Sequence, residues 1–336
     1  MDIVKIISDA YVSYARYFTE QLTLQNEGGL LKNYFWILLF ISGFFFLLEI
    51  VRPWRENQAR FRKDFWQDFF YMYFNFFLFS LLIFHASSSV VVGFVQDGFQ
   101  RVSGIDLAKS NLMSGLPLWA VLLTGFVVRD FVQWWTHRLL HRVPFLWRFH
   151  QVHHSVKEMG FAAHLRYHWM ETIVYRSIEY IPLALLGVGL YEFFLIHVIT
   201  LAWGHYNHAN ISLSGRLTGG TLAGVIAIIA LINYPSADMV NGIMIVIGAI
   251  LFGVFVAGPF MKYIFNSPEM HIWHHAYDLP AGHAYGINFG LTLAIWDYIF
   301  GTAVIPTTGR DIPLGFRGDE RFPDNFGKQL LHGFGK

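Results

Sequence analysis

The chain has 336 residues, of which 54% are hydrophobic and 18% aromatic, while only 14% are charged. Soluble domains carry about 25% charged residues, so this composition favours lipid as the surroundings. The net charge of +1 gives no reason to expect nucleic acid as a partner, and the absence of cysteine excludes disulfides, iron–sulfur clusters and thiolate metal sites. Any metal ion must therefore be held by nitrogen and oxygen.

The expected fold is an all-α, polytopic membrane bundle with a cytosolic, histidine-rich cap that holds two metal ions. Residues 1–32 lack a signal-peptide pattern and read as an amphipathic segment on the membrane surface. Crossing a bilayer takes about 20 apolar residues. Residues 33–116 are expected to contain two spans, Asn33–Val51 and Phe65–Phe84, and a third is expected at Pro117–Thr136.

Two helical hairpins are expected after the third span. The first pairs Ile173–Gly187 with Tyr191–Trp203, and its Arg176 and Glu179 suggest that it enters only part of the bilayer. The second pairs Gly219–Ile232 with Val240–Gly258. Residues 304–336 are expected to form a cytosolic tail.

The orientation follows from basic residues. The loop Arg52–Asp64 has five Lys or Arg against two acids, whereas Ala86–Leu116 has two of each. The first loop should be cytoplasmic, which places every histidine motif and the C-terminus on the cytoplasmic side. We expect a multi-pass protein of a bacterial inner membrane or of an ER-type membrane.

Three histidine motifs stand out: HRLLH, HQVHH and HIWHH. Residues at i, i+3 and i+4 share a helix face, so each motif can direct its rings to one point. Pro144 can break the helix between the first two motifs and let them fold together. Eight imidazoles exceed what one ion uses and predict two metal ions, iron or zinc. The eight are His137, His141, His150, His153, His154, His271, His274 and His275.

Incidental histidines, a pH switch and peptidase or soluble di-iron chemistry fit these motifs less well. An isolated histidine pair is commonly incidental, but three motifs together are not, and a pH switch needs only one or two rings. HRLLH lacks the glutamate of HExxH peptidases, and paired Glu-x-x-His motifs of soluble di-iron bundles are missing from the sequence.

A carboxylate also lies close to the first motif. Asp130 is in the third span, seven residues before His137. A charged group within a span is costly and commonly has a function. We expect Asp130 to accept the second ring proton of a ligand histidine.

The motifs in this order resemble the fatty acid hydroxylase/sterol desaturase superfamily of integral-membrane di-iron enzymes. LRYHWME, NHANI, NSPEMHIWHH and INFGLTLAIWDYIFGT extend the resemblance over residues 117–303, and the ending is similar to bacterial members and to alkylglycerol monooxygenases. About sixty residues separate NHANI from HIWHH, where the family needs a short link, so the hairpin at 219–258 reads as an insertion.

The resemblance implies a di-iron domain in which the eight histidines are catalytic metal ligands and His208 is a ninth. His205 and His168 are further candidate ligands. Asp297, Asn210 and Asn288, which belong to the matching motifs, are expected to support the ligands.

The implied activity is O2-dependent hydroxylation or desaturation of a lipid C–H bond, in a sterol, a fatty acyl chain or an ether lipid. Electrons would come from a ferredoxin or a small b-type cytochrome with its reductase. Arg138, Arg142 and Arg148 could dock that donor or bind lipid headgroups. Two alternatives stay open: a catalytically silent zinc protein that binds lipid or metal, and a proton-coupled transporter. For a transporter, the spans offer only Asp130, Glu49 and Glu179.

Overall fold

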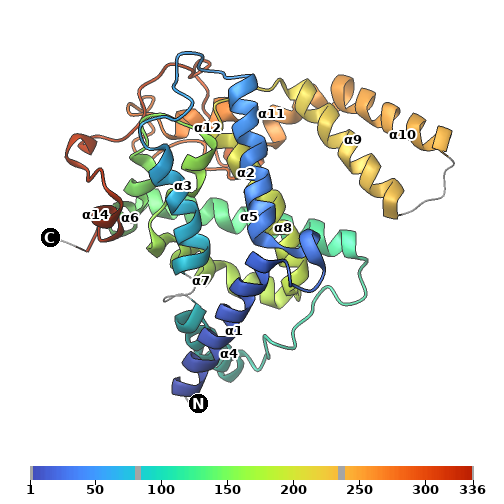
Figure 1. Ribbon diagram of the computed structural model, residues 1–336, viewed down its shortest axis with the longest axis vertical. Coiled ribbons are helices and arrows are strands. Elements are labelled where there is room, and N and C mark those ends of the chain that lie inside the picture. The colour runs from blue at the N-terminus through green and yellow to red at the C-terminus, as the bar shows by residue number, and fades with distance from the viewer. Residues whose placement is uncertain (1–2, 80–84, 234–238, 335–336) are drawn as a thin grey trace.

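The computed structural model describes residues 3–79, 85–233 and 239–334. Within these ranges the chain is helical and has no β-strand, only isolated bridges between Phe265 and Leu293 and between Ala276 and Leu314. Figure 1 shows a bundle from which one helical hairpin projects to the side. The all-helical prediction is confirmed.

Many of the helices follow one another with short connections, whereas residues 275–294 and 300–325 form long connections between α12, α13 and α14. Their bounds are α1 Ile3–Thr23, α2 Tyr34–Val51, α3 Phe65–Tyr73, α4 His85–Ser103, α5 Leu118–Arg142, α6 Pro144–His154, α7 Trp169–Leu186, α8 Leu190–His208, α9 Gly215–Asn233, α10 Met239–Phe252, α11 Met261–Ile264, α12 Pro268–His274, α13 Ile295–Ile299 and α14 Phe326–Leu330.

The first predicted span coincides with α2. The second is α3 followed by a π-helical turn, Phe74–Leu78, and its end at residues 80–84 lies outside the described residues. The third extends further than expected, because α5 runs on to Arg142 and so carries the HRLLH motif inside the helix.

Two helices in the described residues are long and apolar enough to cross a membrane: Tyr34–Val51 and Val240–Ile264. A shorter apolar helix, Gly215–Leu231, accompanies the second. Helix α5 does not belong to this set, since Arg129, Asp130 and Gln133 interrupt its apolar sequence. The composition and these helices fit a membrane protein.

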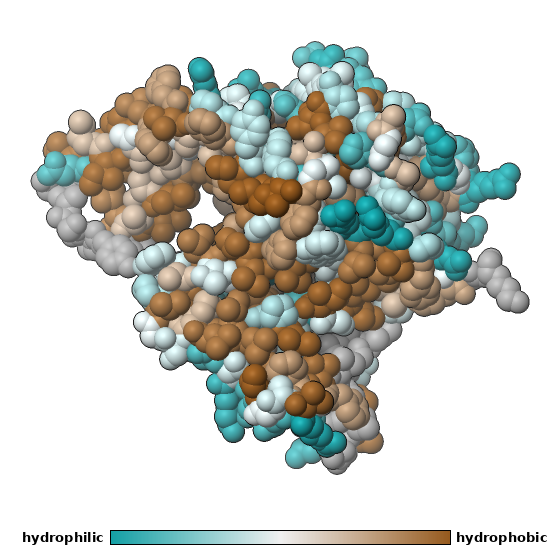
Figure 2. Space-filling view, turned by 180° about the vertical axis from the view of Figure 1, so that it is seen from behind, coloured by the Kyte–Doolittle hydropathy of each residue, from teal (hydrophilic) through white to brown (hydrophobic). Residues whose placement is uncertain are grey.

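The hairpin of α9 and α10 exposes many apolar side chains. Its outer positions are occupied by aliphatic and aromatic side chains, among them Ile226, Ile229 and Phe255, and Figure 2 shows it as a largely hydrophobic arm beside the body. Glycines allow the two helices to touch closely: a Cβ on Gly219 would lie 2.4 Å from the Gly253 carbonyl oxygen. Dispersion and backbone contacts of this kind hold helices together where lipid removes the hydrophobic driving force.

The body is built around α5, which packs against α6, α7 and α8. Helix α2 covers α8, and α1 packs on α4 at the end of α2 remote from α12 (Figure 1). Buried Leu38, Met72, Phe77 and Leu201 form one of the core clusters between these helices.

The C-terminal residues pack on the body as a structural element. The Phe326 ring meets Phe70, Tyr71 and Phe74 edge-on, with centroids 4.7–4.9 Å apart. The carbonyl oxygen of Leu330 accepts hydrogen bonds from His168 Nε2 and Trp169 Nε1. These contacts place the end of the chain against the first turn of α7.

Candidate metal centre

Helices α5 and α6 bring the first two motifs face to face. His137 and His141 lie one turn apart on α5, and extended Val143 with Pro144 ends α5 and starts α6. The ring centroids of His141 and His154 are 4.8 Å apart. Pro144 thus turns the chain back as the sequence predicted, since its ring suits the first turn of a helix but not the interior of one.

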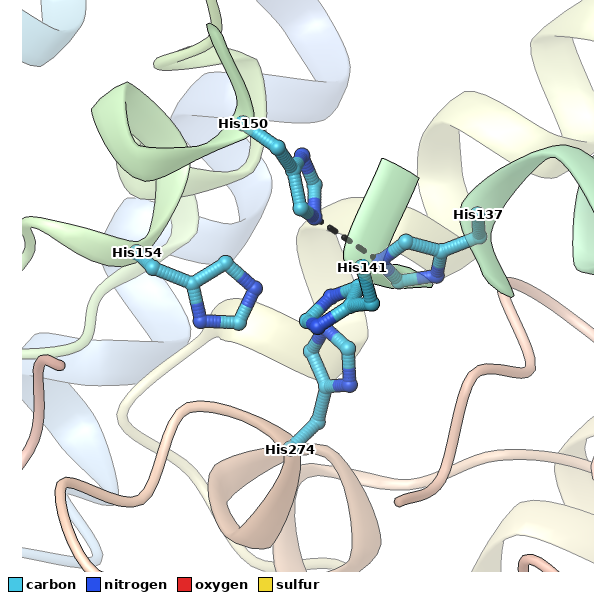
Figure 3. A group of neighbouring side chains, drawn as sticks. All are labelled: His137, His141, His150, His154 and His274. Atoms are coloured by element: carbon cyan, nitrogen blue, oxygen red, sulfur yellow. Dashed lines mark hydrogen bonds between the residues drawn. The ribbon is translucent and has the colours of Figure 1, made fainter. Parts of the chain in front are cut away.

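All nine histidines predicted as ligands lie in two adjoining groups. Within each group the candidate ligand nitrogens are all within 4.8 Å of one another. The rings of His154 and His275 connect the groups, with centroids 4.4 Å apart. The five-histidine group, drawn in Figure 3, is His137, His141, His150, His154 and His274, and the four-histidine group is His153, His208, His271 and His275.

Several of the Nε2 atoms face one another rather than ordinary hydrogen-bond partners. Nε2 of His137 lies 3.1 Å from Nε2 of His150, and the Nε2 atoms of His208 and His271 are 3.0 Å apart. Three further buried Nε2 atoms have no hydrogen-bond partner among the described residues, which costs about 1–3 kcal/mol each in a protein interior; they belong to His141, His154 and His274. A cation between the rings would satisfy these lone pairs.

Hydrogen bonds on the opposite side of the rings fix how the histidines point. Five Nδ1 atoms lie within hydrogen-bond distance of an oxygen, so that they donate and leave Nε2 free to coordinate. The partners are the carbonyl oxygens of Phe289 for His137, Arg166 for His153, Gly204 for His208 and Ile287 for His274, and the Glu171 carboxylate for His150. Burial also lowers the pKa of His153 to about 4, which keeps its ring neutral.

Glu171 is the carboxylate that supports a predicted ligand. Its Oε2 accepts from His150 Nδ1 at 2.7 Å, while Oε1 accepts from the backbone N–H of His168 and completes the cap of α7. Burial raises the pKa of Glu171 to about 8, and a cation on the far side of His150 would offset that cost through its charge. Glu171 belongs to the LRYHWME motif but was not predicted as a functional residue, although a glutamate at the start of an apolar helix is a usable signal.

Asn288 positions two ligands through its neighbours' carbonyls. It has φ 54°, a left-handed conformation that asparagine tolerates better than most residues. Its side chain bonds Met270 O and both backbone groups of Val304. The carbonyls on either side of it, those of Ile287 and Phe289, accept from His274 and His137. Asn288 therefore supports the five-histidine group from a distance.

Among the described residues Asp130 accepts no hydrogen bond from a histidine, contrary to expectation, and Asp297 supports a predicted ligand only through the backbone. Asp130 accepts from the N–H groups of Thr292 and Leu293 and from Trp296 Nε1. A buried carboxylate needs donors, and this backbone segment supplies them. Asp297 accepts from Phe289 N and Gly290 N at 2.9 and 2.7 Å, so it steadies the peptide that His137 contacts.

His168 and Asn210 also lie elsewhere than expected. His168 is not near either group: its Nδ1 caps α7 and its Nε2 binds the C-terminal segment at Leu330. Asn210 bonds the backbone of Arg55, and its own N–H donates to Glu49, so it joins the loop after α2 to the end of α8. Both are polar side chains that hold connections between helices.

His205 lies outside the two groups as well. Its Nε2 is 3.0 Å from Ser42 Oγ and its Nδ1 is 2.9 Å from His164 Nδ1. His164 was not predicted from the sequence, because it is a lone histidine in an apolar stretch. Its ring centroid lies 5.2 Å from that of His208, which places it at the edge of the four-histidine group.

Two cavities reach the histidines from different directions. A cavity of about 610 Å³ runs between α5, α7 and α8 and touches His137, His150, His153, His208 and His271. A second, of about 450 Å³, touches His141, His154 and His274 and is otherwise lined by the loop at residues 276–286, by residues 315–317 and by Trp147. The first cavity therefore reaches histidines of both groups, whereas the second reaches only the five-histidine group.

Two converging groups of neutral imidazoles in a helical body with membrane-length helices define a histidine-rich membrane metalloprotein. The family model described as fatty acid hydroxylase matches residues 122–227 and 216–302, more than half of the chain, and the chain belongs to this family.

Two relatives of known name are similar over part of the chain. Ornithine lipid hydroxylase OlsE of Rhizobium tropici is 27% identical over 202 residues, covering 60% of this chain and 47% of that protein. Very-long-chain aldehyde decarbonylase GL1-10 of Oryza sativa subsp. japonica is 30% identical over 126 residues, covering 35% of this chain and 42% of that protein. The chain thus matches less than half the length of each relative. No solved structure matches it.

Proposed function

We propose that this protein is a multi-pass membrane enzyme that uses two iron ions and O2 to hydroxylate or desaturate a C–H bond of a lipid. Family membership and the nine-histidine centre support this function, and the larger cavity is the observation that carries it. The cavity joins histidines of both groups to an apolar wall. The cavity has a volume of about 610 Å³, and its apolar wall includes Leu165, Leu201, Leu291, Phe76, Phe77 and Phe194.

The proposed residues fit two ions. The five-histidine and four-histidine groups would each hold one, and a bound ferrous pair would activate O2, the oxidant, toward an unactivated C–H bond. Hydroxylation balances as one C–H, one O2, two electrons and two protons giving one C–OH and one water; desaturation uses the same reductant and releases two waters. The protein binds the chain in the cavity, orients the target carbon and excludes bulk water.

The second cavity suits the supply of electrons. It reaches His141, His154 and His274 of the five-histidine group, none of which lines the apolar cavity. Exposed Arg142 and Arg148 lie on the elements that carry this group, and Arg317 beside the cavity is 87% exposed. An acidic ferredoxin or small b-type cytochrome would bind such a basic surface and be steered to it.

We place this basic face and the C-terminus in the cytoplasm, as the charged loop after α2 indicates. The host membrane would be a bacterial inner membrane or an ER-type membrane. Sterols, fatty acyl chains and ether lipids are candidate substrates, and the name of the Rhizobium relative adds ornithine lipids.

The test is anaerobic reconstitution of the purified protein with ferrous iron in lipid nanodiscs, followed by O2, a chemical reductant and lipid analysis. We expect about two ions per chain and a lipid product heavier by one oxygen or lighter by two hydrogens. Glu171→Gln should reduce turnover, whereas Glu192→Gln, in the first turn of α8, should not. If the reconstituted protein consumes no reductant and forms no lipid product, or if it retains only zinc, it is a catalytically silent metal protein instead.

A further inference from the structure

The larger cavity is lined by a cluster of charged side chains as well as by histidines. Arg129 comes from α5, and Arg176 and Glu179 come from α7. Arg129 Nε and Arg176 Nη1 lie 3.5 and 3.6 Å from the same oxygen, Oε2 of Glu179. Two guanidinium groups share one carboxylate, so the cluster carries a net charge of about +1.

This charge is enclosed rather than solvated. The side chains of Arg129 and Glu179 are each 3% exposed, whereas that of Arg176 is 33% exposed. Arg129 Nε and Glu179 Oε2 are buried and make no hydrogen bond within the described part of the chain, although they are within ion-pair distance of each other. Burying charge with incomplete pairing is costly, and a buried ion pair is weak evidence for stability. The arrangement therefore calls for a role beyond holding helices together.

The polar side chains that contact the cluster add no negative charge that would neutralise it. Gln133 donates to Glu179 Oε1, Arg129 Nη1 donates to Thr200 Oγ1, and His197 lies between Arg129 and the Tyr34 hydroxyl. Both guanidinium groups also lie over one ring, that of Phe193, at 5.2 and 4.9 Å from its centroid. Besides Glu179, the carboxylate that the described residues place on the cavity wall is Glu171, which is bonded to His150.

We propose that Arg129 and Arg176 bind the carboxylate of a lipid acid and so fix how its chain approaches the histidines; this rests on the proposed function of the same cavity. A single carboxylate matches a net charge of about +1 and the forked donor geometry of arginine. A phosphate monoester, with about −1.5 to −2 at pH 7, would leave excess negative charge in the enclosure. Tyr34 and Phe193 line the cavity beside these arginines.

The spacing along α5 sets which carbon would react. Arg129, Gln133 and His137 all line the cavity and follow at intervals of four residues on one face of the helix. Eight residues of α-helix span about 12 Å. An extended chain advances about 1.2 Å per bond, judged from the three backbone bonds of a residue. The carboxylate site is thus on the order of ten bonds from the histidines, which selects the middle of an acyl chain.

The test measures binding selectivity by the purified protein with its native metal content, without turnover. Unlabelled hexadecanoic acid, hexadecanol and hexadecyl phosphate compete with radiolabelled hexadecanoic acid. We expect the acid to bind at least about tenfold more tightly than the alcohol, as for charge-assisted hydrogen bonds. Arg176→Gln should bring this ratio close to one, whereas Glu179→Gln should raise it by removing the competing carboxylate.

Arg101→Gln, an exposed arginine of α4, is the matched control and should leave the ratio unchanged. Equal binding of acid and alcohol by the wild type, or a ratio that neither cavity variant changes, would overturn the proposal. Stronger binding of the phosphate than of the acid would overturn it in favour of a phosphate site. Because no reaction is required, selective binding without any lipid oxidation would refute only the proposed function.

Discussion

Glu171→Gln tests the link between the carboxylate and the metal centre most directly. The glutamate accepts two hydrogen bonds, from His150 Nδ1 and from the backbone N–H of His168, and it is 3% exposed. A neutral amide has only one oxygen, so its NH2 group must face one of these donors. We therefore expect the His150 ring to lose its fixed orientation while α7 keeps its cap.

The magnitude follows from the contact itself. A hydrogen bond to a charged group contributes about 1.5–3 kcal/mol, which corresponds to roughly 10- to 150-fold in an equilibrium constant. Loss of a partner behind a metal-ligating histidine typically lowers metal affinity about 10- to 100-fold. Glu171→Gln should consequently release one ion per chain at a chelator concentration about 10- to 100-fold lower than the wild type requires.

The assay is metal content by mass spectrometry after dialysis against graded chelator, with the thermal unfolding midpoint recorded in parallel. Glu192→Gln, which makes the same change in the first turn of α8, should behave as the wild type. If Glu171→Gln retains both ions at wild-type chelator concentrations and unfolds at the same temperature, the carboxylate does not support a ligand.

Further variants separate the parts of the centre. His274→Ala and His153→Ala, from the five- and four-histidine groups, should each remove the ion of their own group first, which metal content of the purified variants will show. Asn288→Ala should destabilise the protein by at least about 1 kcal/mol more than Asn288→Gly in thermal unfolding, because an alanine at φ 54° adds strain of about 1–2 kcal/mol; equal losses would exclude strain. Gly219→Leu should separate α9 from α10, since even a Cβ there meets the Gly253 carbonyl, and limited proteolysis should then cut the hairpin while metal content stays unchanged.

The sequence predicted well which histidines come together, because histidine motifs carry a signal in residue type and spacing. His137 and His141 share a helix face at i and i+4 wherever that helix lies, and Pro144 marks the turn between two motifs. The long apolar run at Asn33–Val51 likewise left little freedom of interpretation. In these places the residue types and their spacing are enough to predict the local structure that the folded chain adopts.

The supporting contacts could not be predicted in the same way. The acceptors for His137 and His274 are backbone carbonyls of Phe289 and Ile287, and any residue has a carbonyl, so no letter in the sequence identifies them. Asp130 was assigned by its distance along α5 from His137, but its actual donors come from a segment about 160 residues later. Only the folded chain decides which long-range partner a buried carboxylate meets.

The α9–α10 arm leaves and rejoins the body at nearly the same place. A Cβ on Gly215, where the arm begins, would lie 2.5 Å from the carbonyl oxygen of Gly258, where it ends. Elongation, trimming or replacement beyond this neck would therefore not be transmitted to His208 and His271, which flank it in the sequence. The length and sequence of the arm can therefore diverge without a change in how the two histidine groups are held.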